Sequence, residues 1–207
     1  MFITFEGPDG SGKTTQLKKL SAFLQKRGYK IVSTREPGGT SIGDQIRHLL
    51  FSMKNTGMHP RTEILLFQAS RAQHVEELIK PSIESGAIVL CDRYADSTIA
   101  YQGYGHRIDL QQLHTIVNFA TSGLTPGLTI LLDIDAEEGL KRRNKDGGWN
   151  RMEAYELAFH RRVREGYKEL IKQNPSRWVV IDGTLPIEQV EKRIRKAVLA
   201  FIDKQSG

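Results

Sequence analysis

Residues 7 to 14 read Gly7-Pro8-Asp9-Gly10-Ser11-Gly12-Lys13-Thr14, a complete G-x-x-x-x-G-K-[ST] phosphate loop. The run before it, 2–5, is short, apolar and β-prone, and 15–26 after it carries apolar side chains at helical spacing. Strand, glycine loop and helix is the arrangement that this motif requires. A glycine-rich turn with a solvated lysine is the alternative, but it leaves the agreement of both flanking elements unexplained.

The glycines of this loop let consecutive backbone N–H groups turn inward without a Cβ clash. Together with the helix N-terminus behind them, these groups form a cradle for an anion. Lys13 brings a mobile positive charge to the β- and γ-phosphates of a nucleotide, and the hydroxyl of Thr14 is placed to ligate Mg²⁺.

The chain has 207 residues, enough for one large domain with a real core. It shows no linker, low-complexity stretch or internal repeat, so we expect a single domain over 1–207. No apolar run approaches the roughly 20 residues of a membrane span. The N-terminus runs directly into 2–5 without a basic segment or a cleavage site, so we expect neither a secretory signal nor membrane attachment.

The single cysteine, Cys91, cannot form an intrachain disulfide, which fits a reducing cytoplasm. Cys91 ends the apolar run 87–90, and this position favours a buried strand residue over a nucleophile. The six histidines show no metal-ligand spacing among themselves or with Cys91.

The net charge is +6, which raises the question of nucleic-acid binding. Such binding requires basic residues on one continuous face with interleaved aromatic residues. The arginines are instead dispersed, which suits a cleft for small polyphosphates better and argues against a nucleic-acid partner. A solvated basic surface remains the simpler interpretation of Lys18, Lys19, Lys192, Arg193 and Lys196.

Short, nearly continuous apolar runs alternate with helical periods along the chain. The candidate strands are 2–5, 31–34, 87–91, 128–132 and 178–182. Helical patterns follow Asp109, a candidate N-cap, and cover 152–171 and 187–202. Such strands between helices indicate a parallel sheet buried on both faces, in a doubly wound α/β domain with ligands at the carboxyl ends of the strands.

Polar residues follow the predicted strands where such ligands would bind. Asp92 comes after an apolar strand and resembles a Walker B carboxylate, which holds Mg²⁺; an N-cap for the next helix is the alternative. Arg93 needs a partner, and a phosphate matches its guanidinium bidentately. A salt bridge to Asp92 or to Glu36 remains possible.

The segment 141–151 is rich in glycine and basic residues and connects two predicted helices. A mobile flap that closes cations over phosphates is the functional interpretation, and a solvated connection is the alternative. Its Asn144-Lys145-Asp146-Gly147 only mimics the start of the base-reading motif of GTPases, because no strand precedes it.

Several further blocks resemble the thymidylate kinase family of nucleoside-monophosphate kinases. They comprise 5–15, Thr34-Arg35-Glu36-Pro37-Gly38-Gly39-Thr40, Leu66-Phe67 with Ala69-Ser70-Arg71, Cys91-Asp92-Arg93-Tyr94, Ser97, Ala100-Tyr101-Gln102-Gly103 and Asn150-Arg151-Met152-Glu153. The resemblance implies a P-loop NTPase-type five-stranded parallel sheet with helices on both faces and a helical lid. It also implies transfer of the γ-phosphoryl group of ATP to dTMP, giving dTDP, with Mg²⁺, in a cytoplasmic homodimer. Another nucleoside-monophosphate kinase is the alternative, and a P-loop ATPase or switch module is a further one.

The resemblance also implies a role for each matching residue. ATP is bound by Gly7, Pro8, Asp9, Gly10, Ser11, Gly12, Lys13 and Thr14. The thymine stacks on Phe67, is hydrogen-bonded by Arg71, and is faced by Ser97 and Gln102. The acceptor phosphate lies at Arg35 and Arg93, the sugar 3′-hydroxyl at Asp9, and Tyr101 fills the space of a ribose 2′-hydroxyl. Thr14 and Asp92 bind the Mg²⁺ ion.

The residues themselves leave two of these roles open. Phe67 lies in a helical apolar period, so a core residue is the alternative, and Tyr101 could equally be a core tyrosine. Arg71 follows Phe67 by four residues and shares its helical face, so the two can act on one base.

Some members of the family carry an arginine at the position of Gly10. Without it, the resemblance points to the group whose catalytic arginine comes from the lid. Arg151 is the first candidate, because 150–153 is the best-matched part of the lid, and Arg143 is the second. Catalysis then consists of positioning the substrates and stabilising charge. Lys13, Mg²⁺ and a lid arginine stabilise the negative charge of the transition state, and Arg93 holds the acceptor phosphate.

Overall fold

The computed structural model describes residues 1–145 and 150–206. Within this part of the chain, one sheet of five parallel strands has the order β2-β3-β1-β4-β5. The strands are β1 (Phe2–Glu6), β2 (Ile31–Arg35), β3 (Ile88–Asp92), β4 (Leu128–Asp133) and β5 (Trp178–Asp182). The predicted strands are confirmed, with ends that differ by at most one residue.

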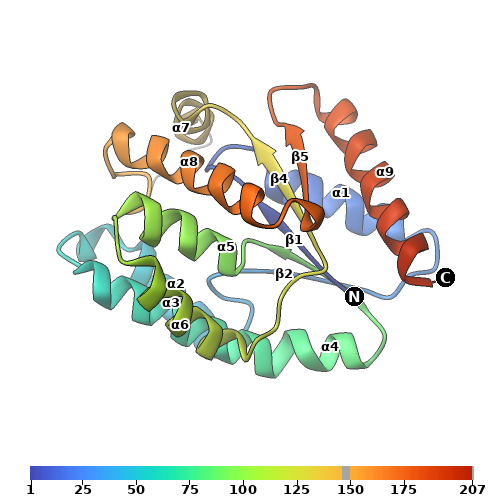
Figure 1. The fold of residues 1–207 in the computed structure, drawn as a ribbon, viewed down its shortest axis with the longest axis horizontal. Coiled ribbons are helices and arrows are strands. Elements are labelled where there is room, and N and C mark those ends of the chain that lie inside the picture. The colour runs from blue at the N-terminus through green and yellow to red at the C-terminus, as the bar shows by residue number, and fades with distance from the viewer. Residues whose placement is uncertain (146–149, 207) are drawn as a thin grey trace.

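Helices connect the strands (Figure 1). They are α1 (Lys13–Gln25), α2 (Ser41–Phe51), α3 (Pro60–His74), α4 (Lys80–Glu84), α5 (Ala95–Thr98), α6 (Leu110–Thr121), α7 (Ala136–Lys145), α8 (Leu157–Gln173) and α9 (Ile187–Ser206). Short 3₁₀ turns are η1 (Met53–Asn55) and η4 (Pro175–Arg177), and π-helical segments are η2 (Val75–Ile79) and η3 (Ile99–Gly105). Asp109 caps α6, as predicted, by accepting a hydrogen bond from the Gln112 amide.

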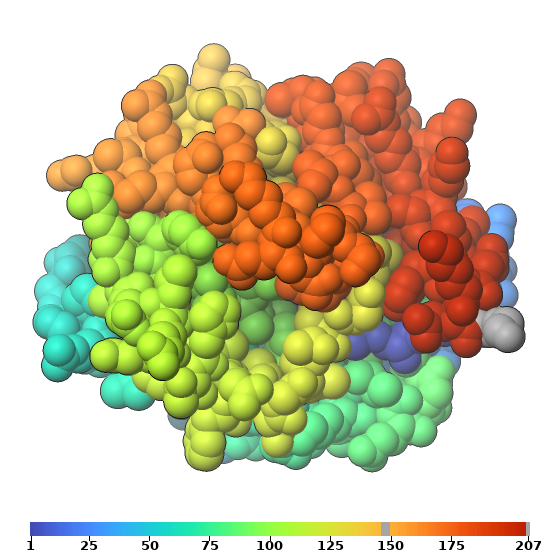
Figure 2. All heavy atoms as spheres, viewed as in Figure 1, coloured from blue at the N-terminus to red at the C-terminus, as the bar shows by residue number. Residues whose placement is uncertain are grey.

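The sheet is buried on both faces, as predicted for an α/β protein. Ile3 and Phe5 of β1 pack with α1 and α9, whereas the alternate residue Phe2 packs with η2 and Tyr94. On the second face α8 also packs on η3, and Figure 2 shows α8 directly beside the η3 and α6 region. Because the strands are parallel, their carboxyl ends lie together at one edge of the sheet, where polar residues gather.

The predicted lid differs from the structure in two respects. Residues 141–145 continue α7 rather than forming a loop, and α8 begins at Leu157 rather than near 152. The apolar spacing that suggested a helix from 152 belongs to a turn, because the Met152 amide donates to the Asn150 side chain at 2.8 Å. The remainder of the predicted flap, 146–149, lies outside the described residues.

Cys91 is a buried residue of β3, as predicted, and its thiol donates to the carbonyl oxygen of Arg93 at 3.0 Å. Burial raises the pKa of this thiol, which disfavours the reactive thiolate. No helix in the described ranges combines the length and apolar character needed to span a membrane.

Candidate active site

The phosphate loop joins β1 to α1 in the predicted arrangement. Gly12 precedes α1 with φ +90°, and Lys13 is the first residue of the helix. The Lys13 ammonium donates to the carbonyl oxygens of Gly7 at 3.0 Å and Pro8 at 2.8 Å, so the side chain folds over the loop. Burial, together with the like charge of Arg93, lowers the pKa of Lys13 to about 8.

Thr14 and Asp92 meet beside this loop. The Thr14 hydroxyl donates to Asp92 Oδ2 at 2.5 Å, and both residues line the same cavity. Asp92 is not the cap of the next helix, because the residue preceding α5 is Tyr94, which makes no side-chain cap. Among the described residues no cluster of three or more His, Cys, Asp or Glu side chains could hold a metal. Hydroxyl and carboxylate oxygens suit Mg²⁺, which is usually bound by few protein ligands together with phosphates.

Two adjoining cavities open at the carboxyl edge of the sheet. The phosphate cavity, about 620 Å³, is large enough for a nucleotide and is lined by Gly10, Gly12, Lys13, Thr14, Arg35, Arg47 and Arg143. The inner pocket is lined by Phe67, Arg71, Ser97, Tyr101 and Gln102. The residues that line both cavities are Asp9, Glu36, Phe51, Arg93, Asn150 and Glu153. The cavities therefore share a wall.

Arg93 is one of the residues of this shared wall. Its Nη2 donates to Asp9 Oδ1 at 2.6 Å and to the Tyr101 hydroxyl at 2.9 Å. Asp9 is its ion-pair partner, rather than Asp92 or Glu36, the two alternatives suggested by the sequence. Arg93 has φ +71°, a left-handed conformation that is rare outside glycine and is found at functional sites.

Asp9 is ionised in this arrangement. Burial alone raises the pKa of a carboxyl group, but the charges of Arg93 and Lys13 outweigh it and hold the pKa of Asp9 well below its ordinary range. The Tyr101 hydroxyl donates to the second oxygen at 2.8 Å. A buried carboxylate, a guanidinium and a phenol thus form one connected network.

The inner pocket brings together the residues predicted to read a base. Phe67 is half-buried at the wall of the pocket. Arg71 is only 1% exposed and donates to Glu36 Oε2 at 2.8 Å and to the Tyr94 carbonyl oxygen at 3.0 Å. Gln102 donates to Glu63 at 2.8 Å. The polar groups of Arg71 and Gln102 are therefore already hydrogen-bonded within the protein.

Two arginines of the phosphate cavity differ in how the sequence identified them. Arg35, predicted, is exposed at the end of β2 and donates to Asp44 at 3.1 Å. Arg47, which the sequence did not identify as a site residue, lies on α2 and donates to the Pro37 carbonyl oxygen at 2.9 Å. Burial and the like charge of Arg35 lower the pKa of Arg47 to about 10. The sequence does carry a signal for Arg47. Thr40 is the N-cap of α2 and accepts a hydrogen bond from the Gly43 amide, so a helix predicted to begin after Thr40 would have included Arg47.

The two lid arginines occupy different environments. Arg143 is partly exposed, lines the phosphate cavity and donates to Glu153 at 2.8 Å. Arg151 is 3% exposed, lines neither of the two cavities, and donates to Glu63 at 2.5 Å and to the Leu50 carbonyl oxygen at 2.8 Å. Glu63 therefore holds the guanidinium of Arg151 outside both cavities, and this placement favours Arg143, the second candidate of the sequence, over Arg151.

A five-stranded parallel sheet with a phosphate loop after β1, beside a cavity large enough for a nucleotide, defines a P-loop NTPase fold. Comparisons with known proteins identify the family. A family model described as thymidylate kinase matches residues 5–194. The chain is 49% identical to the thymidylate kinase of Roseiflexus castenholzii, over 98% of this chain and 94% of the relative. It is 51% identical to that of an Exiguobacterium species, over 94% and 92%.

Among solved structures, the crystal structure of thymidylate kinase from Ehrlichia chaffeensis matches with a TM-score of 0.77 and 38% identity, over 96% of this chain and 98% of that chain. The chain belongs to the thymidylate kinase family. As a member of this family it phosphorylates dTMP to dTDP with ATP, which confirms the main functional prediction over its alternatives.

Proposed function

We propose that the phosphate cavity holds ATP, that the inner pocket holds dTMP, and that the γ-phosphoryl group passes directly between them. The observation that carries this proposal is the shared wall, which includes the ion pair of Arg93 and Asp9. A guanidinium placed between two phosphate-bearing ligands can hold the acceptor phosphate in line with the donor. No side-chain general base is needed, since a monophosphate oxygen is already anionic.

In the inner pocket we assign each side chain to one part of dTMP. Phe67 stacks on the thymine, and Arg71, Ser97 and Gln102 face its polar edge. Tyr101 fills the position of a ribose 2′-hydroxyl, and its bond to Asp9 supports this, because it fixes the phenol against the sugar site. Asp9 binds the 3′-hydroxyl. Arg93, with the exposed Arg35, binds the acceptor phosphate.

On the ATP side, the loop 7–14 binds the phosphates, and Lys13 with Arg143 stabilises the charge of the transition state. Thr14 and Asp92 fit a Mg²⁺ ion and would hold it together with the phosphates. When bound, this ion neutralises charge on the phosphate oxygens. The lid residues of the shared wall, Asn150 and Glu153, exclude water from the reacting groups.

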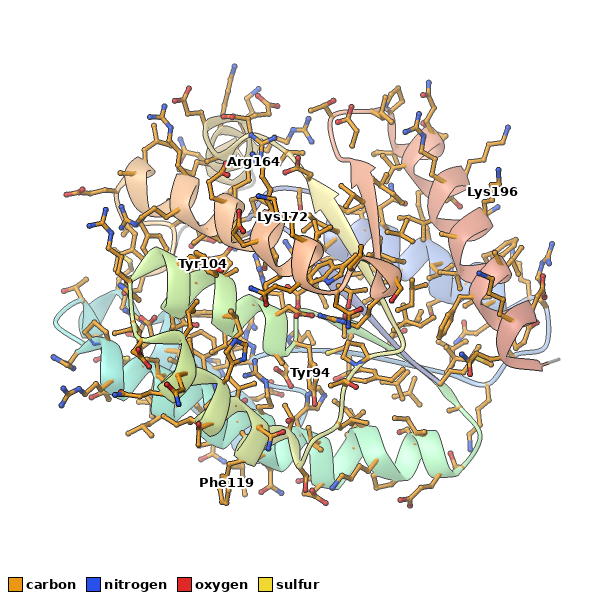
Figure 3. All side chains as sticks on the ribbon, in the orientation of Figure 1. Tyr94, Tyr104, Phe119, Arg164, Lys172 and Lys196 are labelled. Carbon is orange, nitrogen blue, oxygen red and sulfur yellow. The ribbon has the colours of Figure 1, made fainter. Side chains whose placement is uncertain are left out.

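We further propose that the enzyme is a homodimer in the cytoplasm, a compartment that fits the buried single thiol of Cys91. The dimer surface is assigned to the exposed side of α3 and its neighbours α2 and α6, which carries Leu49, Leu65 and Phe119. Phe119 is 86% exposed and projects from α6 (Figure 3). Three exposed apolar side chains on adjacent helices suit an interface, and a second copy of this side would cover them.

Light scattering tests the dimer with Phe119→Asp and a control, Val180→Asp, at an exposed apolar residue of β5 outside this side. We expect Phe119→Asp to be monomeric at concentrations where the wild type and the control are dimers. A monomeric wild type would contradict the dimer.

The assignment of the two cavities is tested by a coupled ADP-release assay across dTMP, dUMP, dCMP, dGMP and dAMP, with a reaction lacking any acceptor. We expect dTMP to be the preferred acceptor and hydrolysis without acceptor to be negligible. Acceptor-independent release of ADP would contradict direct transfer and favour an ATPase.

A further inference from the structure

Glu6 is a buried carboxylate with no part in the transfer described above. It is the last residue of β1, directly before the phosphate loop, and it is 0% exposed. Its Oε1 accepts from the Tyr94 amide at 2.8 Å, and its Oε2 accepts from the Ser97 hydroxyl at 2.6 Å and the Tyr167 hydroxyl at 2.8 Å. It lines neither the phosphate cavity nor the inner pocket.

The same two hydroxyls contact Arg93. Its Nη1 donates to Ser97 Oγ at 3.1 Å and to the Tyr167 hydroxyl oxygen at 3.3 Å. A hydroxyl has one proton, and a guanidinium can only donate. The two hydroxyl oxygens also lie 3.0 Å apart, so each could donate to the other. An ionised Glu6 is the stronger acceptor, and with both protons directed at it both oxygens are left as acceptors for Arg93.

We propose that Glu6 is a positioning residue for the phosphoryl transfer: it takes the hydroxyl protons of Ser97 and Tyr167, and so holds both oxygens as acceptors that fix Arg93 at the shared wall. The proposal rests on the assigned role of Arg93 in holding the acceptor phosphate. It explains why an ionisable group is retained at the buried end of β1, where an apolar residue would pack without desolvation cost.

An amide cannot replace this carboxylate in either orientation. If the amide NH₂ of a glutamine took the place of Oε2, it would donate to the two hydroxyls; one hydroxyl could then donate to the other, but the second proton would turn toward Arg93. If the NH₂ took the place of Oε1, it would face the amide N–H of Tyr94. Each orientation opposes a donor to a donor, and a buried donor without an acceptor is costly.

The charges around Glu6 support the assignment. Burial, with the like charge of Asp96, raises the pKa of Glu6 to about 7, while Arg93 opposes this rise. The charged or titratable groups that face Glu6 from the surrounding elements are Lys13, Cys91, Arg93, Asp96, Tyr167 and Arg177. A protonated Glu6 would become a hydrogen-bond donor and disturb the same hydroxyls. The value of kcat/KM for dTMP should therefore fall at acid pH.

The test compares Glu6→Gln with Glu191→Gln, a matched change on α9 outside the active site. We expect Glu6→Gln to lower kcat/KM for dTMP by about tenfold to a hundredfold and to leave KM for ATP unchanged. In the wild type, kcat/KM for dTMP should fall below pH 7 more steeply than in Glu6→Gln, which retains only the titration of the substrate phosphate. Unchanged kcat/KM, or the same pH profile in both proteins, would overturn the proposal.

A double-mutant cycle with Tyr167→Phe separates positioning from general packing. Removing the phenol hydroxyl also removes the mismatch that Glu6→Gln creates there, so the double variant should lose no more activity than Glu6→Gln alone. Multiplying losses would overturn the proposal. If Glu6→Gln does not fold, Tyr167→Phe alone should still lower kcat/KM for dTMP and spare KM for ATP, and no effect would count against it.

The variant Arg93→Lys tests the role of Arg93 in holding the acceptor phosphate, on which the Glu6 proposal rests. If Arg93→Lys leaves kcat/KM for dTMP intact, the assigned acceptor role of Arg93 fails, and the Glu6 proposal fails with it. If Arg93→Lys is impaired and Glu6→Gln is not, the Glu6 proposal alone fails.

Discussion

The phosphate loop and α7 are in backbone contact at Gly10 and Gly139. A Cβ atom on Gly10 would lie 2.2 Å from the carbonyl oxygen of Gly139, and Gly10 has φ +74°. No side chain fits at position 10, so a catalytic cation cannot come from the loop at this point. The helix that closes off this position also carries Arg143, four residues beyond Gly139, to the phosphate cavity.

Arg143→Ala should lower kcat by about a thousandfold or more, the usual effect of losing an arginine that stabilises phosphoryl transfer. ATP affinity should change little, because the contact strengthens in the transition state. Steady-state kinetics with both substrates saturating gives the answer. Near wild-type turnover would remove Arg143 from the mechanism.

Arg151→Ala should instead act on stability. Removing it leaves Glu63 buried without its guanidinium, which typically costs about 3–5 kcal/mol. Urea unfolding should show this loss, and the folded fraction should keep more turnover than Arg143→Ala. A variant of normal stability with a thousandfold lower kcat would restore Arg151 as the catalytic arginine.

Lys13→Ala should abolish turnover and leave dTMP binding largely intact, because Lys13 faces the phosphate cavity and not the inner pocket. Calorimetry with dTMP alone measures the second half of this prediction. Complete loss of dTMP affinity in a folded variant would show that Lys13 acts on the acceptor site. Since the pKa of Lys13 is about 8, ATP affinity of the wild type should also fall as the pH rises above that value.

Phe67 and Arg71 should control the choice of base. Arg71→Ala should cost at least about 1–3 kcal/mol of transition-state stabilisation, because the polar edge of the bound base would lose its hydrogen-bond partner. Phe67→Ala should raise KM for dTMP far more than KM for ATP. Equal effects of Phe67→Ala on both substrates would indicate a folding defect and refute stacking.

Glu63 should make stability depend on pH. Burial raises its pKa, but hydrogen bonds from His106 and Gln102 and the charge of Arg151 lower it to about 2, below the ordinary 4.5. A folded-state pKa below the unfolded value stabilises the protein above about pH 4.5, and this contribution is lost as the pH falls toward 2.

Urea unfolding of the wild type and Glu63→Gln across this range isolates the contribution, because the other carboxyl groups titrate in both proteins. The wild type should lose up to about 3 kcal/mol more than the variant. Parallel curves would show that Glu63 has an ordinary pKa in the folded protein.

The sequence predicted those parts of the site that depend on local order along the chain. The phosphate loop is contiguous, and Asp92 and Arg93 follow a strand whose apolar run is unambiguous, so their place at the edge of the sheet followed from the parallel topology. The role of Arg71 came from the family resemblance, and its spacing to Phe67 on one helix agreed with it.

The remainder depends on contacts between distant residues. Arg151 is buried because Glu63, 88 positions away, binds it, and no local pattern marks that pair. Glu6 meets Tyr167 across 161 positions. The turn over 151–155 has the apolar spacing of a helix, but the Asn150 side chain replaces the helical hydrogen bonds at its start.

Binding of a bisubstrate analogue, adenosine and thymidine joined through five phosphates, tests the shared wall most directly. One molecule should fill both cavities, so calorimetry should show one analogue per chain, and inhibition should be competitive against ATP and against dTMP. Arg93→Lys, at the wall itself, should weaken this binding. Competition with only one substrate, or two analogue molecules per chain, would show that the cavities do not join and would contradict direct transfer across Arg93.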